Sequence, residues 1–208
     1  LLLAGISTGF YAQPAAFEAI DFDTITLVLG MMIMVGTIER TGLIEYLAII
    51  IAKKSRGKVW YLLIGLGAFT AVASAVMDNV TTMVLVAPIT LSITDLLSLS
   101  PIPFLISESM LSIVGGMTTL IGAPPNIMIG SAANFGFNQF ITHLGPIALV
   151  VWVISVFYFW FKFNKILPRE TDKAEALEEM DPARTIESWN DVKKAISVIV
   201  IVIVLYLI

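Results

Sequence analysis

Long apolar runs separated by short polar stretches predict a chain built from membrane helices. We expect residues 24–38, 104–134 and 146–161 to cross the bilayer, and a further span to begin near Ala195. A helix of about 20 apolar residues is long enough to cross the hydrocarbon core. Residues 43–52 present one broad apolar face and end in a basic cluster, which is typical of an interfacial helix. The predicted fold class is an all-α polytopic membrane protein.

Two further apolar arms, residues 59–76 and 80–97, meet at the polar pair Asp78 and Asn79. If both arms cross the bilayer, this pair is an ordinary external turn. If both arms enter and return, the pair lies near the midplane, where an aspartate costs about 2.5–3.5 kcal/mol on insertion scales. Arm length suits either arrangement. Polar side chains on the arms near the turn favour re-entry: Thr70, Ser74, Thr81 and Thr82.

The 104–134 span is predicted to break, because helix-breaking residues crowd its middle. In a helix interior, proline costs about 3 kcal/mol and glycine about 1 kcal/mol. We expect the first half to end near Ile121, leaving carbonyl groups that suit a cation, and the second half to offer an amide end that suits an anion. A structural kink is the simpler alternative. The breakers are Gly115, Gly116, Gly122, Pro124 and Pro125.

The composition supports the same class of protein. Of the 208 residues, 58% are hydrophobic and 13% are charged, and the mean hydropathy is +0.92. A soluble domain carries about 25% charged residues, so we expect an integral membrane protein with the lipid bilayer as its solvent and no nucleic-acid partner. The sequence contains no cysteine, which excludes disulfides and thiolate metal sites, and His143 is its one histidine.

Basic residues are confined to a few parts of the chain, with none between Val59 and Phe161. Cytoplasmic loops are enriched in Lys and Arg, so we expect these parts to face the cytoplasm. Residues 168–192 then form a solvated, charged cytoplasmic linker. The chain begins on Leu1 and closes within an apolar run, so we expect a fragment cut inside a membrane helix at both ends. The basic residues are Arg40, Lys53, Lys54, Arg56, Lys58, Lys162, Lys165, Arg169, Lys173, Arg184, Lys193 and Lys194.

Two motifs resemble those of the ion-transporter superfamily. The first is residues 74–82, SAVMDNVTT, and the second is residues 115–126, GGMTTLIGAPPN. The superfamily includes arsenite efflux permeases, sodium/proton antiporters of the NhaD type, citrate transporters, divalent anion:sodium symporters and the pigment-cell P protein. The chain is most similar to P-protein-like bacterial permeases. The resemblance extends over almost the whole chain up to about residue 166, and the two motifs together are specific.

The resemblance implies a fold of two inverted repeats that build the transport site jointly. Each motif occurs once here, so we expect the first repeat only, with its arms forming a re-entrant hairpin (59–97). It also implies an elevator-type movement and a homodimer of the full-length protein. The expected parts are scaffold helices ending in an interfacial helix (1–58), half of the transport domain (59–135), a membrane helix (136–167), the cytoplasmic linker (168–192) and the start of the second repeat (193–208).

Carried over by position, the resemblance implies a sodium site and one side of a substrate site at the hairpin tip and the broken helix. Close relatives carry an acid where this chain has Ala123, which leaves the coupling ion open. Asp78 is the main ionisable candidate, as a cation ligand or proton acceptor, and a hairpin-tip cap is the alternative. Glu108 is a further candidate proton relay, or else a helix-start or interfacial carboxylate. The expected sodium ligands are Asp78, Asn79, Thr118, Thr119 and Gly122. The expected substrate contacts are Asn79, Thr81, Thr82, Pro124, Pro125 and Asn126.

The predicted function is secondary active transport of an anion or oxyanion (arsenite-, citrate- or dicarboxylate-like), coupled to a sodium or proton gradient and with no other cofactor. Sodium/proton antiport is the alternative. An ion channel is more remote, because channels favour pore-lining rings from several subunits. We expect no enzyme activity, since an intramembrane aspartyl protease needs two facing aspartates and only Asp78 is deep. The expected location is the plasma membrane of a prokaryote.

Overall fold

The computed structural model describes residues 22–133 and 135–207. Every regular element in these two ranges is a helix, which confirms the all-α class. The residues before Phe22, which include the start of the predicted scaffold segment, lie outside the described part. In chain order the helices are α3 (Phe22–Glu39), α4 (Leu43–Ser55), α5 (Val59–Val76), α6 (Asn79–Leu96), α7 (Ile102–Gly116), α8 (Pro124–Ala133), α9 (Phe137–Phe163), α10 (Ala176–Glu179), the 3-10 helix η1 (Pro182–Thr185) and α11 (Trp189–Leu207).

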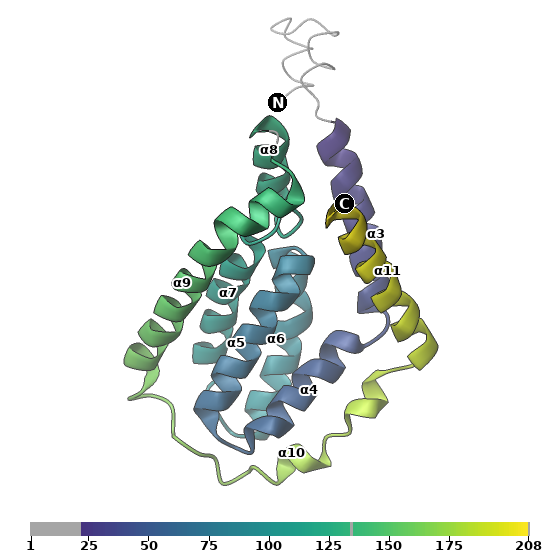
Figure 1. The fold of residues 1–208 in the computed structure, drawn as a ribbon. Helices are drawn as coiled ribbons and strands as arrows, with labels where there is room; N and C mark the ends of the chain where they lie inside the picture. Colours follow the sequence, from purple (N-terminus) through teal and green to yellow (C-terminus); the bar gives the residue numbers. More distant parts are fainter. Residues whose placement is uncertain (1–21, 134, 208) are drawn as a thin grey trace, which may run out of the picture.

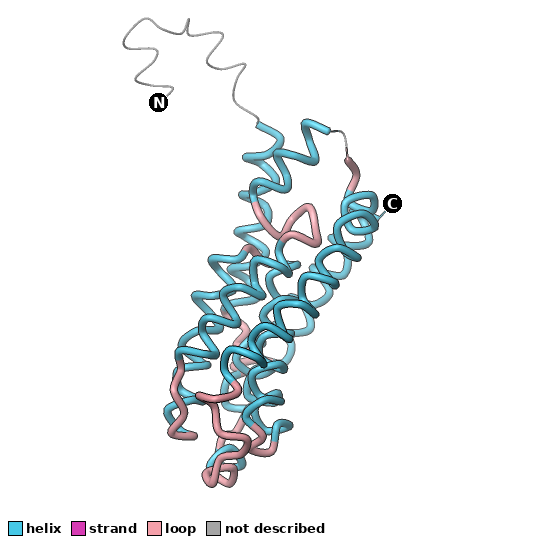
Figure 2. The backbone as a smooth tube through the Cα atoms, turned by 90° about the vertical axis from the view of Figure 1, so that its left-hand side faces the viewer, coloured by secondary structure: helices cyan, strands magenta, loops and turns pink. Residues whose placement is uncertain are grey.

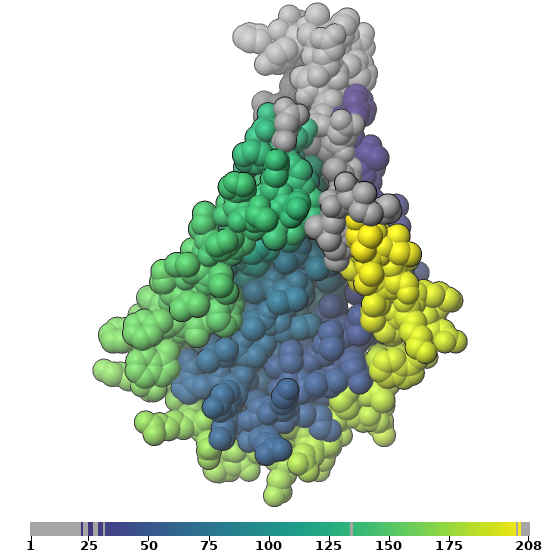
Figure 3. Space-filling model, in the orientation of Figure 1, coloured from purple at the N-terminus to yellow at the C-terminus, as the bar shows by residue number. Residues whose placement is uncertain are grey.

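Three of the described helices, α5, α6 and α9, are long and apolar enough to cross a membrane. Figure 1 shows α5, α6 and α7 side by side at the centre, with α9 along one side and α3 and α11 along the other. The molecule is broad at the end that carries α4 and α10, and it narrows toward α8, as Figure 3 shows. The protein is therefore an integral, multi-pass membrane protein.

Helices α5 and α7 pack closely because glycines lie at their contact. Gly67 lies against the side chain of Leu111, and Gly115 lies against the backbone carbonyl of Ala71. A Cβ at either glycine would overlap these atoms, so the two backbones approach as closely as glycine allows. Leu66 and Leu111 are fully buried beside them.

The break in the long span lies earlier than the sequence predicts. Helix α7 ends at Gly116, not near Ile121, and α8 begins at Pro124. The reason is local, because the backbone N–H and the hydroxyl of Thr118 both donate to the carbonyl oxygen of Gly115, at 3.0 and 2.6 Å. These bonds close a tight turn at the helix end. Pro124 then starts α8, where a missing amide donor is not needed.

Helix α9 also differs from its predicted bounds of 146–161. It begins at Phe137 and ends at Phe163. The Gln139 side chain accepts a hydrogen bond from the Gly136 backbone N–H at 3.1 Å, which caps the earlier start. Pro146 lies inside the helix, a position that membrane helices tolerate.

The linker 168–192 is less solvated than its charges predict. Leu177 in α10 and Ile186 are buried, and α10 contacts both α4 and α6. Burial of these two apolar side chains among charged neighbours holds the segment against the helices. The linker therefore covers the base of the α5–α6 hairpin, the end formed by Val59 and Leu97.

Candidate functional site

The tip of the α5–α6 hairpin is built around the carboxylate of Asp78. Its Oδ1 accepts hydrogen bonds from the backbone nitrogens of Val80 and Thr81, each at 2.9 Å. The Thr81 hydroxyl donates to Oδ2 at 2.5 Å. Asp78 is thus the N-cap of α6, the alternative that the sequence left open. A carboxylate has about four lone-pair sites, so these three bonds leave about one site for a cation.

Asn79 joins the tip to α5 and meets the end of α7. Its Oδ1 accepts a hydrogen bond from the buried hydroxyl of Ser74 at 2.6 Å. The same oxygen lies where a Cβ of Gly116 would stand, so glycine at that position gives it room. The two sequence motifs are therefore in direct contact at Asn79 and Gly116.

The turn between α7 and α8 folds back on the tip. Figure 2 shows this turn as a loop among the helices, away from the loops at the broad end. The Thr119 hydroxyl donates to the carbonyl oxygen of Ala75 at 2.5 Å. The Asn126 side-chain nitrogen donates to the carbonyl oxygens of Gly116, at 2.9 Å, and Thr119, at 2.8 Å. Gly122 lies against Gly116 so closely that a Cβ would not fit. The broken backbone is thus satisfied by side chains of the same two motifs.

A cavity of about 260 Å³ opens beside the tip. Most of its lining is apolar, and Asp78 and Thr81 supply its polar side chains. Drug-sized ligands occupy pockets of about 300–1,000 Å³, so this space suits a small ion or a part of a larger site. The lining residues come from α3, the α6 N-terminal region, the turn and α8: Met32, Val35, Asp78, Val80, Thr81, Ile121, Pro124 and Ile127.

Oxygen acceptors outnumber hydrogen-bond donors around the tip. The Asp78 carboxylate and the carbonyls of Gly116 and Thr119 are acceptors, whereas α8 offers few amide donors. Pro124 and Pro125 carry no N–H, and the Asn126 N–H already bonds to the carbonyl oxygen of Ala123 at 2.9 Å. Hard cations prefer oxygen ligands, so the geometry of this half of the site favours a cation.

Several predicted residues do not line this cavity. Thr118 faces another cavity, of about 360 Å³, lined by residues of α5, α7 and α9. Thr82 is buried, and its hydroxyl has no hydrogen-bond partner among the described residues. Glu108 is buried within α7, roughly two turns before Gly116. Pro125 is exposed.

Sequence reasoning missed two contributions to the site. Ser74 holds Asn79, and the signal for it was its place among the polar residues near the turn. Met32 and Val35 of α3 line the cavity. No pattern distinguishes them, because apolar residues of a predicted scaffold helix look alike whether they face lipid or a cavity.

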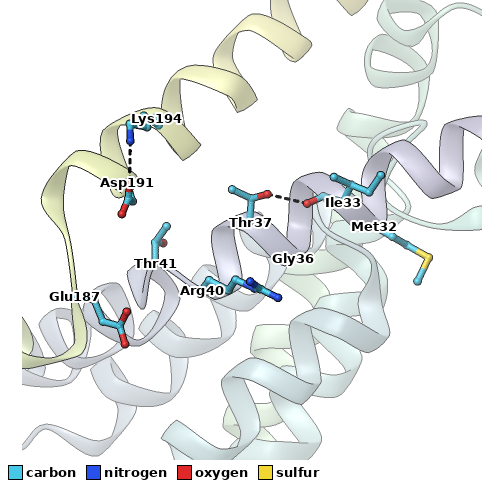
Figure 4. Close-up of a pocket in the computed structure, with 9 residues that line it drawn as sticks. All are labelled: Met32, Ile33, Gly36, Thr37, Arg40, Thr41, Glu187, Asp191 and Lys194. Carbon is cyan, nitrogen blue, oxygen red and sulfur yellow. Dashed lines mark hydrogen bonds and ion pairs between the residues drawn. The ribbon is translucent and has the colours of Figure 1, made fainter.

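A larger cavity, of about 590 Å³, lies between α3 and the start of α11 (Figure 4). Its charged side chains are of both signs: Arg40, Glu187, Asp191 and Lys194. Lys194 donates to Asp191 at 3.0 Å, so part of this charge is already paired. The mixed and exposed charges select for neither sign of ligand, and the cavity at the hairpin tip is the better candidate.

Comparison with known proteins gives a family match over the whole chain and relatives over parts of it. A family model described as citrate transporter matches residues 1–208. An uncharacterized transporter of Mycobacterium bovis is 39% identical over 183 residues, covering 88% of this chain and 42% of that protein. A 46 kDa membrane protein of Mycobacterium leprae is 46% identical over 135 residues, covering 65% of this chain and 32% of that protein.

The human P protein is 45% identical over 114 residues, which cover 55% of this chain and 14% of that protein. No solved structure matches the chain. The chain spans less than half the length of these curated relatives. The family match over all 208 residues and the transporters among the relatives show that the chain belongs to the citrate transporter family of membrane transporters.

Proposed function

We propose that the full-length protein is a secondary active transporter that moves a small anion or oxyanion, coupled to a sodium or proton gradient. The observation that carries the proposal is the contact between the two motifs, where the hairpin tip and the turn after α7 meet beside one cavity. Irregular backbone is tolerated at membrane depth where it is buried in protein or lines a cavity. The description of the family as citrate transporters supports an anionic substrate.

The arrangement of helices supports a re-entrant hairpin. Helices α5 and α6 turn back at the level where α7 ends, and α8 continues beyond that level (Figure 1). We therefore assign 59–135 to a transport domain that slides, elevator-like, against a scaffold that includes 1–58. A second inverted repeat supplies the other half of the site. The proposed setting is a homodimer in the plasma membrane of a prokaryote.

Within the site, the cation and the substrate use different groups. The proposed sodium ligands are the oxygens of Asp78, Asn79 and Thr119, with backbone carbonyls such as that of Gly116. A substrate carboxylate or oxyanion needs donors, and the candidate is the side-chain nitrogen of Asn79, because the Asn126 amide and the Thr81 hydroxyl already donate their hydrogens within the site. The α8 N-terminus adds a favourable dipole, worth about 0.3–1 kcal/mol for an anion at an exposed site.

Sodium/proton antiport is the second candidate, and the excess of oxygen acceptors around the tip favours it. An antiporter needs a cation site and a proton acceptor, and Asp78 serves either role. In this case the apolar cavity would hold a hydrated cation and no organic anion.

The test uses the full-length protein reconstituted in vesicles. Uptake of labelled citrate, succinate and arsenite is measured with a sodium gradient, with a proton gradient and with neither. Saturable uptake that depends on one gradient supports the proposal. Sodium-driven proton release without uptake of any anion supports antiport, and large unitary currents support a channel.

A matched pair of variants ties the activity to the tip. Asn79→Ala removes the partner of Ser74 and a proposed ligand, and we expect a loss of at least about tenfold in uptake, which corresponds to 1.4 kcal/mol. Asn138→Ala, at an exposed position at the start of α9, serves as the control and should transport normally. Equal uptake by both variants would remove Asn79 from the site.

A further inference from the structure

Glu108 is a buried carboxyl group that the hairpin tip does not use. Its side chain is 1% exposed. Its Oε1 accepts a hydrogen bond from the Thr90 hydroxyl of α6 at 2.7 Å. Its Oε2 is buried and has no hydrogen-bond partner among the described residues. An ionised carboxylate in such a place lacks most of the bonds that water would give it.

Other buried hydroxyl groups lie on α5, α6 and α7, the helices that pack together at this carboxyl. On α6, Thr82, Thr90 and Thr94 recur at helical spacing and are buried, and on α7 Ser112 lies one turn beyond Glu108. Residues spaced by three or four lie on one face of a helix. We call this set the polar seam, and its members are Thr70, Ser74, Thr82, Thr90, Thr94, Glu108 and Ser112, all at most 1% exposed.

Along their helices, Ser74, Thr82 and Ser112 of the polar seam lie between the tip and the level at which Glu108 meets Thr90. The hydroxyl of Ser74, the member of the polar seam nearest the tip on α5, donates to Asn79 Oδ1 at 2.6 Å. The hydroxyls of Thr70 and Ser112 donate to backbone carbonyls of Leu66 and Ser109, so their oxygens keep lone pairs that can accept another hydrogen. Thr82 has no partner among the described residues. The distance from Glu108 to Gly116 along the axis is roughly 12 Å, at about 1.5 Å per residue.

Among the residues that the structure describes, no basic side chain compensates a negative charge on Glu108. The helices packed against α7 are α5, α6 and α9. Neither ion pair among the described residues includes Glu108, and its one hydrogen bond goes to Thr90. The titratable groups on these helices are Tyr61 of α5; Asp78, the N-cap of α6, and Asp95 of α6; and His143, Tyr158 and Lys162 of α9. Asp78 lies at the tip, and the others are exposed.

We propose that Glu108 carries the coupling proton, at a site separate from the substrate cavity. Its carboxylate takes up one proton from one side of the membrane and releases that proton to the other side in each transport cycle, with the polar seam as its connection to the tip. This inference rests on the proposed function and narrows its coupling ion to the proton. In the competing account, Glu108 is a neutral acid that is hydrogen-bonded to the Thr90 hydroxyl and only fills space between the helices.

Gradient-driven uptake and exchange separate these accounts. Glu108→Gln keeps the size and the hydrogen-bond acceptor but carries no titratable proton. In vesicles, we expect it to lose at least about tenfold in uptake driven by a proton gradient. Substrate exchange at equal pH should stay within about twofold of the wild type, because exchange needs no net proton movement. Glu108→Asp should recover part of the driven uptake, and Asp95→Asn, on an exposed site of α6, should behave as the wild type.

The outcomes are distinct. Driven uptake by Glu108→Gln at the wild-type level overturns the inference, and so does an equal loss of driven uptake and exchange. A wild type that exchanges no anion contradicts the proposed function instead. A second measurement is infrared spectroscopy of the purified wild type and Thr90→Val. It requires neither transport activity nor a folded Glu108→Gln variant. We expect a protonated-carboxyl band that shifts when the Thr90 hydroxyl is lost, and the absence of such a band in the wild type overturns the inference as well.

Discussion

The two ends of the α5–α6 hairpin are closed by different kinds of contact. At the tip, the partners are short side chains of the hairpin itself and of the turn that follows α7. At the base, the partners come from the linker, more than seventy positions away. The Thr171 hydroxyl donates to the Leu97 carbonyl at 3.2 Å, and Lys173 donates to the Ser98 hydroxyl at 2.7 Å.

The difference predicts which end is released if the proposed transport domain moves relative to α4. The tip contacts join parts of the proposed transport domain, so they move with it. The linker also binds α4, since Lys53 donates to the Met180 carbonyl at 2.9 Å. Movement of the hairpin relative to α4 must therefore break the linker's contacts with one of the two or shift the linker. The exposed contact between Lys173 and Ser98 contributes little, typically 0 to about 1 kcal/mol.

The largest expected effect is a loss of stability in Gly115→Val, at the contact between α5 and α7. A Cβ at this position overlaps the backbone of Ala71, which cannot move without separating α5 from α7. We expect a loss of about 3 kcal/mol or more in the free energy of unfolding, at the upper end of overpacking effects. Thermal unfolding of the full-length protein in detergent measures it.

Gly36→Ala is the matched control for the glycine substitution. A Cβ at Gly36, within α3, meets nothing within 4 Å, so the change should be neutral or stabilise by up to about 1 kcal/mol. If the two variants unfold at the same temperature, close approach of α5 and α7 is not what Gly115 provides.

The base has its own anchor in Leu177, and Leu177→Ala should cost about 2–3 kcal/mol. Its side chain is 1% exposed and belongs to the main apolar core. Removing buried methyl groups loses their transfer free energy and leaves a cavity. We expect earlier thermal unfolding and faster proteolysis within 168–192. Glu178→Ala, at an exposed neighbouring position, should show neither change. Equal unfolding temperatures and proteolysis rates in the two variants would mean that the linker does not bind through Leu177.

The third prediction separates the two roles considered for Asp78, the N-cap of α6 and a cation ligand or proton acceptor. Asp78→Ala removes the α6 cap and should cost about 1 kcal/mol of stability, whereas asparagine caps nearly as well as aspartate. Asp78→Asn should therefore stay within about 0.5 kcal/mol of the wild type while coupled uptake falls at least about tenfold. Asp95→Asn, exposed on the same helix, is the control. Unchanged uptake in Asp78→Asn leaves the cap as its whole role.

The comparison of tip and base also explains what the sequence could reveal. The tip motifs were readable because their breakers and polar residues stand close together in otherwise apolar runs. Asp78 and Asn79 needed no distant partner to stand out. Their contact with the 115–126 motif was implied by the family resemblance. The position of the break was predicted five residues too late, at Ile121, because the Thr118 hydroxyl decides where α7 ends.

The base contacts and the pairing of Glu108 with Thr90 were not readable for the opposite reason. Lys173 and Thr171 sit in a charged segment whose composition predicts solvation, and nothing local marks Leu97 or Ser98 as their partners. Thr90 and Glu108 are eighteen positions apart on different helices. Their pairing depends on how α6 and α7 are rotated about their axes, which hydropathy alone does not determine.

The smallest expected effect is that of Lys173→Ala, which removes an exposed linker contact to Ser98 at the base. Surface changes of this kind stay within about 0.5 kcal/mol, so thermal unfolding should not change measurably. The transport rate is the sharper readout. If the Lys173–Ser98 contact must break during movement, removing it lowers the energy barrier to movement. The transport rate should then rise by up to about twofold, with the substrate affinity unchanged. Lys165→Ala, an exposed lysine before the linker, is the control. A slower rate in Lys173→Ala alone would mean that this contact supports the moving state, and the base would then be no more releasable than the tip.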